Sequence, residues 1–448
     1  MQMTWINIQQ AENNSEKNII FMPSFLSDGL SSNVQLSFGQ RRIKAIVKTT
    51  TSQSIEVNDY SNPMQIYLSA NLLNELLVQT EITYQLKIHD NECTIGPIIG
   101  LHLGEQQYYY HNRHMKQYID SMHDYQSIGG LIIAFKDGSI DETENCVYGL
   151  YYHDRKKQWR YGKFPLPSVI FRRAYKTTQD LADRLYKKTN GNLFNSISLT
   201  KWDVYLKIRE YQTFKEFLPE TAKVINGQDV KKFLRKHSEI ILKPADLSRA
   251  RGICIIKTVS TETFLLFDYS NGVLLKTIVD NIKLQEFLRS GNFLNGNYIA
   301  QPYINLAKIN NSPWDIRVVM QKNRKKQWQC NGIECRLAGK EHLITNISRG
   351  GSALSIREAT SLSFGEQFTT VIKAKVKDAA FEFCRIMEQT NEHFAEFGLD
   401  LAFDTNQKLW FIEANTRPSF KGFKTMDLNN YYHISTAPIH YAASLAGF

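Results

Sequence analysis

Three oxygen-bearing side chains near the carboxyl end of the chain have the types and spacing of a divalent-cation site. Asp400, Glu413 and Asn415 lie where two short apolar runs, 399–403 and 409–412, flank a polar turn. This pattern predicts a β-hairpin in which Asp400 stands opposite Glu413, with Asn415 on the same face. Two carboxylates and an amide oxygen are ligands that magnesium prefers. A solvated surface hairpin is the structural alternative for the same residues.

A second stretch has the residue types of a phosphate site. A predicted strand at residues 239–243 runs into a small and basic loop that reaches from Lys243 to Gly252. Lys243 would meet phosphates as a point charge, while Ser248, Arg251 and the loop amides would cover them. The spacing is not that of a Walker A loop. An ordinary hairpin with a basic turn is the alternative interpretation.

Two following strands carry further polar groups. Residues 297–306 predict a buried strand that continues through Pro302 into a loop, where exposed backbone groups can pair with the edge of a purine. Residues 313–321 predict a strand on which Asp315 and Arg317 share one face and apolar residues fill the other. A buried charge needs a partner, so an ion pair between these two residues is the structural alternative.

The remaining candidate side chains lie in the next strand and turn. Arg336 belongs to a predicted strand at residues 327–337, and Asn346 and Arg349 belong to a turn with paired glycines at residues 344–353. Helical patterns supply the elements that must hold these strands in place. They are predicted at residues 179–188, 201–217, 229–236, 280–289, 367–396 and 429–446.

The first part of the chain carries no catalytic motif. Residues 1–90 read as a β-rich unit, typical of a small barrel or sandwich. Its predicted strands are 43–50, 54–57, 65–68 and 82–89, with one helix at 70–78. A continuous strand from residue 93 to 104, a helix at 111–124 and a buried strand at 129–135 then favour a parallel αβ unit, which strands at 147–152 and 169–171 extend. No G-x-G-x-x-G is present, so the residues alone do not support a dinucleotide fold.

Composition narrows the class of protein. At 448 residues with 42% hydrophobic residues, the chain predicts several packed domains. No apolar run has the length of a membrane span and the start lacks a signal-peptide pattern, so we expect a cytoplasmic protein. The net charge of +10 is scattered, which favours small anions such as nucleotides over nucleic acid. The six cysteines form no C-x-x-C pair and are expected to be reduced, mostly buried thiols.

The order of these motifs resembles a known family. Lys-Pro with a small loop, Q-P-Y-I, D-I-R-V, a strand arginine, T-N-I-S-R-G-G, G-L-D-L and E-A-N follow one another as in the ATP-grasp superfamily, in the branch of the RimK-like glutamate ligases. The chain looks most similar to the YheC/YheD family, whose members are described as endospore coat-associated. The resemblance runs from about residue 95 to the C-terminus, and the extra N-terminal unit is similar to the longer YheD type.

The resemblance implies a fold of mixed α+β and α/β class. It consists of an ATP-grasp fold, in which two α+β subdomains grip ATP, preceded by a Rossmann-like pre-ATP-grasp domain and a small β-rich domain. The expected domains are 1–90 (β-rich), 91–176 (pre-ATP-grasp) and 177–448 (ATP-grasp), the last with a nucleotide loop at 243–252, a hinge at 301–304 and a metal hairpin at 398–418.

The resemblance also implies roles for individual residues, which fall into three groups. Nucleotide contacts are expected from Lys243, Ser248, Arg251, Gly252, Gln301, Pro302, Tyr303, Ile304, Asp315 and Asn346. Catalytic arginines are expected at Arg317, Arg336 and Arg349. Magnesium, or manganese in its place, is expected at Asp400, Glu413 and Asn415.

The implied activity is an ATP- and magnesium-dependent ligase that joins a carboxylate to an amine through an acyl phosphate. Its partners would be a nucleotide, unidentified carboxylate and amine substrates, and spore coat proteins, with no nucleic acid and no membrane span. One departure favours an alternative: Leu247 and Ala250 stand where relatives have glycines, which restricts close approach to phosphate. The alternative is a catalytically weak or inactive ATP-grasp scaffold that acts as a structural or binding protein associated with the spore coat.

Overall fold

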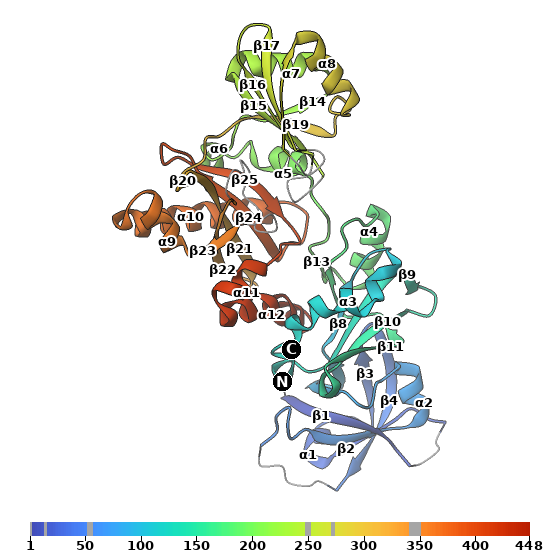
Figure 1. Ribbon diagram of the computed structural model, residues 1–448. Helices are drawn as coiled ribbons and strands as arrows, with labels where there is room; N and C mark the ends of the chain where they lie inside the picture. Colours follow the sequence, from blue (N-terminus) through green and yellow to red (C-terminus); the bar gives the residue numbers. More distant parts are fainter. Residues whose placement is uncertain (1, 13–15, 52–56, 247–251, 270–273, 340–350) are drawn as a thin grey trace.

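The described residues form four β-sheets, one closed into a barrel and three open (Figure 1). The computed structural model describes residues 2–12, 16–51, 57–246, 252–269, 274–339 and 351–448. The barrel and the second sheet lie at one end, the third sheet lies at the other, and the fourth sheet lies between them (Figure 1). The two termini lie close together near the barrel.

The N-terminal barrel confirms the predicted β-rich unit. Its strands follow the order β1-β5-β2-β4-β3-β7-β6, and β1 closes it by pairing with β6. Alternation places Ile6, Ile8 and Leu36 inside. The strands are β1 (Gln2–Gln10), β2 (Ile19–Pro23), β3 (Asn33–Phe38), β4 (Arg41–Thr50), β5 (Met64–Leu68), β6 (Thr83–His89) and β7 (Glu92–Gly96), with helices α1 (Ser24–Ser27) and α2 (Ala70–Leu76). Strands β1 to β3 were not predicted, and most of the strand predicted at 54–57 lies outside the described residues.

The second sheet has the parallel centre that the sequence predicted. Strands β9, β8, β12 and β13 run parallel, and two antiparallel strands extend the β9 edge. The sheet consists of β8 (Ile98–His102), β9 (Leu131–Asp141), β10 (Cys146–His153), β11 (Gln158–Pro165), β12 (Val169–Arg172) and β13 (Leu193–Phe194). The continuous strand predicted over 93–104 is wrong: it divides at Pro97 into β7 of the barrel and β8 of this sheet.

The connection from β8 to β9 is also less regular than predicted. The helix expected over 111–124 consists of short turns, of which α3 (Asn112–Met115) is the only α-helical one. The others are η1 (Gln107–Tyr110), η2 (Lys116–Tyr118), η3 (Asp120–Met122) and η4 (Tyr125–Ser127), and η5 (Asp154–Lys156) follows β10.

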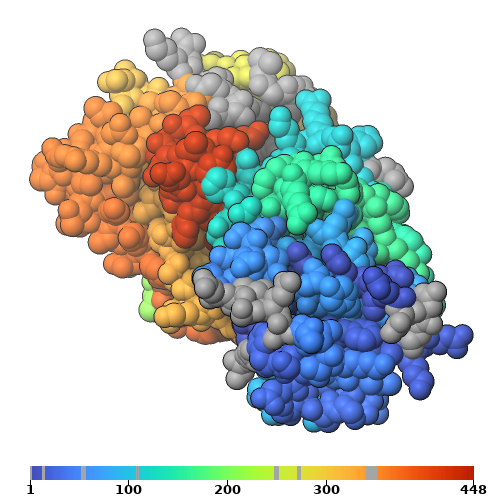
Figure 2. All heavy atoms as spheres, turned by 90° about the horizontal axis from the view of Figure 1, so that it is seen from below, coloured from blue at the N-terminus to red at the C-terminus, as the bar shows by residue number. Residues whose placement is uncertain are grey.

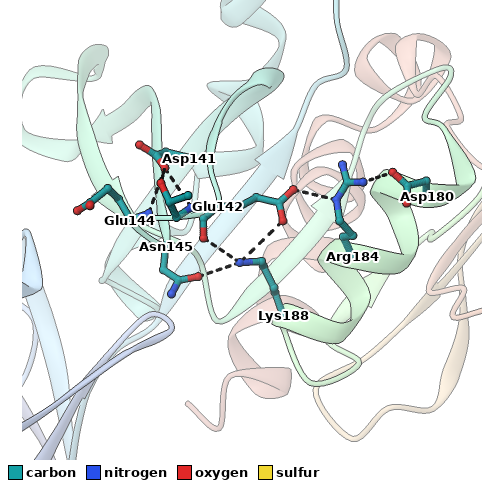
Figure 3. A network of polar contacts seen from close by, with 8 residues as sticks. Asp141, Glu142, Glu144, Asn145, Asp180, Arg184 and Lys188 are labelled. Carbon is teal, nitrogen blue, oxygen red and sulfur yellow. Dashed lines mark hydrogen bonds and ion pairs between the residues drawn. The ribbon is translucent and has the colours of Figure 1, made fainter.

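Hydrogen bonds and ion pairs join helix α4 (Gln179–Lys188) to the turn between β9 and β10 (Figure 3). Glu142 accepts a hydrogen bond of 2.8 Å from Nε of Arg184, and Lys188 Nζ donates to Asn145 Oδ1 at 2.9 Å. Within the turn, Asp141 Oδ1 accepts the backbone N–H groups of residues 143 and 144. Helix α4 and strand β13 therefore belong with the second sheet, although the expected boundary at residue 177 would assign them to the following domain.

The third sheet is antiparallel and carries two helices on one face. Its order is β14-β19-β15-β16-β17-β18. Val230, Phe233, Leu284 and Leu288 of the helices form a core with the sheet. The elements are β14 (Ala222–Val224), α7 (Gly227–His237), β15 (Glu239–Pro244), β16 (Cys254–Thr258), β17 (Thr263–Asp268), β18 (Leu275–Asp280), α8 (Asn281–Ser290) and β19 (Tyr298–Pro302).

The fourth sheet has a helical layer on one face and the C-terminal helices on part of the other. Its order is β23-β22-β21-β24-β25, with β20 paired to β21. The strands are β20 (Lys308–Ile309), β21 (Ser312–Lys322), β22 (Trp328–Leu337), β23 (Ser352–Leu354), β24 (Glu396–Phe403) and β25 (Leu409–Asn415). The helices are α5 (Lys201–Ile208), α6 (Gln212–Lys215), α9 (Ile356–Ser363), η7 (Glu366–Phe368), α10 (Thr369–Glu388), α11 (Lys421–Met426) and α12 (Leu428–Leu445).

Two helix predictions need correction here. The helix expected over 201–217 is divided into α5 and α6. The helix expected over 367–396 ends at Glu388, because residues from Glu396 onward enter β24 and are buried in the sheet. No helix of the described residues has the length and apolarity needed to cross a membrane. All six cysteines are free thiols, and five of them are buried.

Candidate active site

A row of four ionisable side chains crosses the fourth sheet. Glu334, Arg317, Asp400 and Glu413 are direct neighbours across β22, β21, β24 and β25. Successive residues of a strand point to opposite faces, so Ile316 packs into the helical core while Arg317 faces away from it. The register confirms the predicted pairing of Asp400 with Glu413. Glu334 was not anticipated, because the strand order that aligns it with the others is not visible in the local sequence.

Asp400 is held by two arginines. Arg317 donates from Nε to Asp400 Oδ1 at 2.5 Å and from Nη2 to Oδ2 at 3.1 Å, and Nη2 of Arg336 lies 3.0 Å from Oδ2. Burial alone would raise the pKa of Asp400, but the two guanidinium groups outweigh it and hold the pKa well below its usual range. Asp400 is therefore ionised at neutral pH although its side chain is buried.

Arg336 forms a second, bidentate pair. Its Nε and Nη2 each donate to a different carboxylate oxygen of Asp315 at 2.6 Å. Burial lowers the pKa of Arg336, but Asp315 and Asp400 raise it well above its ordinary value. The sequence predicted that Asp315 and Arg317 share a face, which is correct. Each residue nevertheless pairs with a neighbouring strand and not with the other.

Glu413 connects the row to the helix that precedes the third sheet. Asn415 Nδ2 donates to Glu413 Oε1 at 3.0 Å, and Lys201 Nζ lies 3.4 Å from Glu413 Oε2. Lys201 is the first residue of α5, whose start is fixed by a capping box with Thr200 as N-cap. Lys201 was not predicted as a site residue, since only the docking of α5 brings it here.

Lys243 lies at the end of β15, as predicted. Its Nζ donates to Gln301 Oε1 at 2.9 Å, and Gln301 Nε2 donates to Thr221 Oγ1 at 2.9 Å. Burial lowers the pKa of Lys243 to about 8, Glu413 and Asp400 oppose this effect, and Lys201 adds to it. An anion that approached Lys243 would favour its charged form.

These residues line one cavity of about 1100 Å³. One wall is apolar and comes from the third sheet, with Ile241, Ile253 and the segment from Pro302 to Ile304. The cavity brings together ten of the predicted site residues, namely Lys243, Pro302, Tyr303, Ile304, Asp315, Arg317, Arg336, Asp400, Glu413 and Asn415.

The other predicted site residues are not on the cavity wall or are not described. Gln301 lies behind Lys243, to which it is hydrogen-bonded. Gly252 has a φ of +69° and packs against Pro244, and it does not line the cavity. Ser248, Arg251, Asn346 and Arg349 lie outside the described residues, as do Leu247 and Ala250.

Glu334 is a buried acid on the same cavity wall. Its side chain is only 2% exposed, and its Oε1 has no hydrogen-bond partner among the described residues. Burial raises its pKa to about 7, against the opposing charges of Arg336 and Arg317. Gly422 of α11 leaves room for it, because a Cβ at that position would lie 1.7 Å from Glu334 Oε1.

The donor set fits magnesium in chemical type. Asp400 and Glu413 supply carboxylates from adjacent strands, and the hydrogen bond to Glu413 uses the amide nitrogen of Asn415, which leaves its amide oxygen as a ligand atom. Both oxygens of Asp400 bond to arginines in this arrangement. No group of three or more His, Cys, Asp or Glu side chains suited to a metal occurs among the described residues, so the amide is needed to complete the set.

The cavity thus has the basic end of β15 on one side and the charged face of the fourth sheet on the other. Residues 190–445, more than half of the chain, match the family described as "YheC/D like ATP-grasp". The chain belongs to this family.

Two similar relatives come from Bacillus subtilis (strain 168). The endospore coat-associated protein YheD is 25% identical over 443 residues, which cover 93% of this chain and 91% of the relative. The endospore coat-associated protein YheC is 22% identical over 318 residues, 68% of this chain and 86% of the relative. Among solved structures, D-alanyl-alanine synthetase A from Vibrio cholerae O1 aligns with 78% of this chain and 98% of its own, at 9% identity and a TM-score of 0.47.

Proposed function

We propose that the protein is an ATP- and magnesium-dependent ligase that joins a carboxylate to an amine through an acyl phosphate. The observation that carries this proposal is that one cavity is lined by Lys243, by the paired arginines Arg317 and Arg336, and by the oxygen ligands of the β24–β25 hairpin. Membership in the ATP-grasp family supports ATP as the nucleotide.

The nucleotide would lie between the third and fourth sheets. The apolar wall from Pro302 to Ile304 would contact the base, and Lys243 and Lys201 would meet the phosphates as point charges. Asp400, Glu413 and Asn415 would hold magnesium, which when bound neutralises phosphate charge and orients the oxygens. Each cation of the site now pairs with an internal acceptor, so these contacts would exchange when the nucleotide binds.

The chemistry needs positioning more than a protein nucleophile. A substrate carboxylate oxygen attacks the γ-phosphorus, and ADP leaves with the electrons of the bond that breaks. An amine then attacks the acyl carbon and phosphate departs. Arg317 and Arg336 lie on the cavity wall where negative charge would develop, and fixed positive charge at that point is the main contribution such a site makes.

Trapping of the acyl phosphate tests this function. Purified protein is incubated with Mg-ATP, hydroxylamine and a panel of carboxylic acids, and ADP and hydroxamate are measured together. We expect equal amounts of both products with one class of acid, and loss of both in Glu413→Gln. Phosphate found on a hydroxyl group of the acceptor would show a phosphotransferase and contradict the ligase.

The names of the relatives support a link to the endospore coat, so we propose that the protein acts in the cytoplasm during coat formation or within the coat. A second candidate is a weak or inactive ATP-grasp scaffold with a structural role, which Leu247 and Ala250 in the nucleotide loop favour. A deletion strain separates the two candidates. Equal rescue by the wild type and by Glu413→Ala would favour the scaffold, and failure of Glu413→Ala alone would favour the ligase.

A further inference from the structure

The cavity continues beyond the charged row toward the second sheet, where its lining changes. The C-terminal segment (red) and the segment of short turns between β8 and β9 (cyan) lie side by side (Figure 2), and residues of both line this part of the cavity. Lys424 and Tyr431 hold the two segments together through Asp120, at 2.9 Å and 2.6 Å. The walls here carry the aromatic and apolar side chains of Tyr118, Phe171, Tyr175, Phe420, Tyr431 and Ile439, beside the cations Arg173, Lys421 and Lys424.

Arg417 is one cation of this part of the cavity, which Arg173 and Lys424 also line. Its guanidinium lies 4.2 Å from the ring centre of Tyr175, and its Nη2 donates to the hydroxyl of Tyr118 at 3.4 Å. Its Nη1 is buried and finds no hydrogen-bond partner among the residues that the structure describes. No carboxylate of the described chain forms an ion pair with it. The stacked ring and the weak hydroxyl contact orient the guanidinium without neutralising it.

The charge balance around Arg417 is positive. Arg172 and Arg173 lie nearby, and Glu396 pairs with Arg173 at 2.7 Å. Arg172 donates to the carbonyl oxygens of Asn195 and Ala174 and to the hydroxyl of Ser198, and it forms no ion pair among the described residues. Burial, together with the charges of Arg173 and Arg417, lowers the pKa of Arg172 to about 10, against the opposing charge of Asp137. The three guanidinium groups thus have two carboxylates near them, Glu396, which pairs with Arg173, and Asp137, which lies 2.6 Å from His102 Nε2.

An excess of positive charge that is partly buried favours an anion beside it. At about 1100 Å³ the cavity is slightly larger than the roughly 300–1,000 Å³ typical of pockets for one small ligand. Arg417 follows Asn415 by two residues, and Asn195 Nδ2 fixes the intervening carbonyl of Thr416 at 2.9 Å. An anion on Arg417 would therefore lie beside the ligands proposed for magnesium and the phosphates.

We propose that Arg417 anchors the carboxylate of the acceptor substrate, and that this substrate carries its carboxylate on an apolar or aromatic body. The guanidinium provides two parallel N–H donors for the planar carboxylate, and the rings of Tyr118 and Tyr175 contact the body. The catalytic meaning of this subsite rests on the proposed ligase function, but its binding chemistry does not. The lysines at the nucleotide end, which belong to α5 and β15, serve the phosphates.

Binding of matched small probes tests the subsite without nucleotide. The probes are 4-phenylbutyrate, its neutral amide 4-phenylbutyramide, and inorganic phosphate, titrated by NMR or calorimetry at fixed ionic strength. The proteins are the wild type, Arg417→Gln, Arg417→Lys and Arg113→Gln, the last an exposed arginine of α3 that carries the same charge change. We expect 4-phenylbutyrate to bind the wild type and Arg113→Gln with equal affinity. Its affinity for Arg417→Gln should be at least tenfold lower, and its affinity for Arg417→Lys should be intermediate.

Four outcomes would overturn the proposed subsite. The wild type could show no saturable binding of 4-phenylbutyrate, or Arg417→Gln could bind 4-phenylbutyrate as tightly as the wild type does. The wild type could also bind the amide, or phosphate, as tightly as it binds 4-phenylbutyrate. Circular dichroism of each variant controls for folding, and Arg417→Lys keeps the test valid if Arg417→Gln does not fold. Mg-ATP binding by Arg417→Gln is measured in parallel. If Arg417→Gln still binds Mg-ATP but no longer binds 4-phenylbutyrate, the nucleotide site is intact and the substitution has affected the subsite alone.

Discussion

Arg317 and Asp400 stand directly opposite each other on β21 and β24 and share two hydrogen bonds, of 2.5 Å and 3.1 Å. The residue proposed to bind the metal thus holds an arginine proposed to meet the phosphates. If both proposals hold, metal binding at Asp400 and release of the arginines toward a nucleotide would be parts of one exchange of charge partners.

Removal of the Asp400 charge should destabilise the folded protein. Asp400→Asn leaves Arg317 and Arg336 without one of their anionic partners in a buried position, which costs about 3–5 kcal/mol of unfolding free energy. Urea denaturation at pH 7 measures the change. Asp378→Asn, on the exposed side of α10, is the matched control and should change little. A loss below 1 kcal/mol in Asp400→Asn would show that water already screens the cluster.

Stability should also depend on pH through Glu334. Its pKa of about 7 in the folded protein lies above the ordinary value of 4.5, so the folded state holds the proton more tightly than the unfolded state. The stabilisation is fully present below pH 4.5 and is lost as pH rises through 7. Relative to Glu334→Gln, the wild type should therefore lose about 3 kcal/mol between pH 4.5 and pH 8.

Urea denaturation of the wild type and of Glu334→Gln at pH 5 and pH 8 measures this difference. Glu286→Gln, on the exposed face of α8, controls for the loss of one carboxylate at each pH. A constant difference between the wild type and Glu334→Gln across the range would mean that Glu334 is solvated in the folded state.

Gly398 should tolerate no side chain. It lies beneath the segment that carries Arg417, and a Cβ there would meet Pro418 Cβ at 2.5 Å and Arg317 Cδ at 3.3 Å. Gly398→Ala would push this segment away from the sheet, at a cost of about 1–3 kcal/mol of unfolding free energy. It should also weaken nucleotide binding, since Asn415 pairs with Gly398 in the hairpin.

Gly138→Ala is the control for Gly398→Ala. Gly138 also lies in a strand, but a Cβ there would have no neighbour within 4 Å. Equal effects of the two substitutions on thermal unfolding would contradict the importance of close packing at Gly398.

The hairpin and the faces of the strands could be predicted from the sequence because both depend on local pattern. A polar turn between two apolar runs fixes which residues are opposite, so the pairing of Asp400 with Glu413 followed directly. Alternation likewise placed Asp315 and Arg317 on one face. Their true partners could not be predicted, because β21 lies between β22 and β24 only in the assembled sheet.

Other features escaped prediction for related physical reasons. Lys201 enters the site only because α5 docks beside Glu413, which no spacing along the chain reveals. Arg417 belongs to a stretch that the sequence singled out, but its contacts come from Tyr118 and Tyr175 of another unit. Strand β1 has few apolar residues, since one of its faces is polar, and barrel closure stabilises it where local propensity does not.

Thermal unfolding with and without Mg-ATP tests the central claim, the nucleotide site, most directly. A ligand present at one hundred times its dissociation constant adds about 2.7 kcal/mol to the unfolding free energy, which raises the midpoint measurably. The account predicts that Mg-ATP raises the midpoint of the wild type and of Lys283→Ala, an exposed lysine of α8, but not that of Lys243→Ala. No rise in the wild type at millimolar Mg-ATP, or an equal rise in Lys243→Ala, would contradict it.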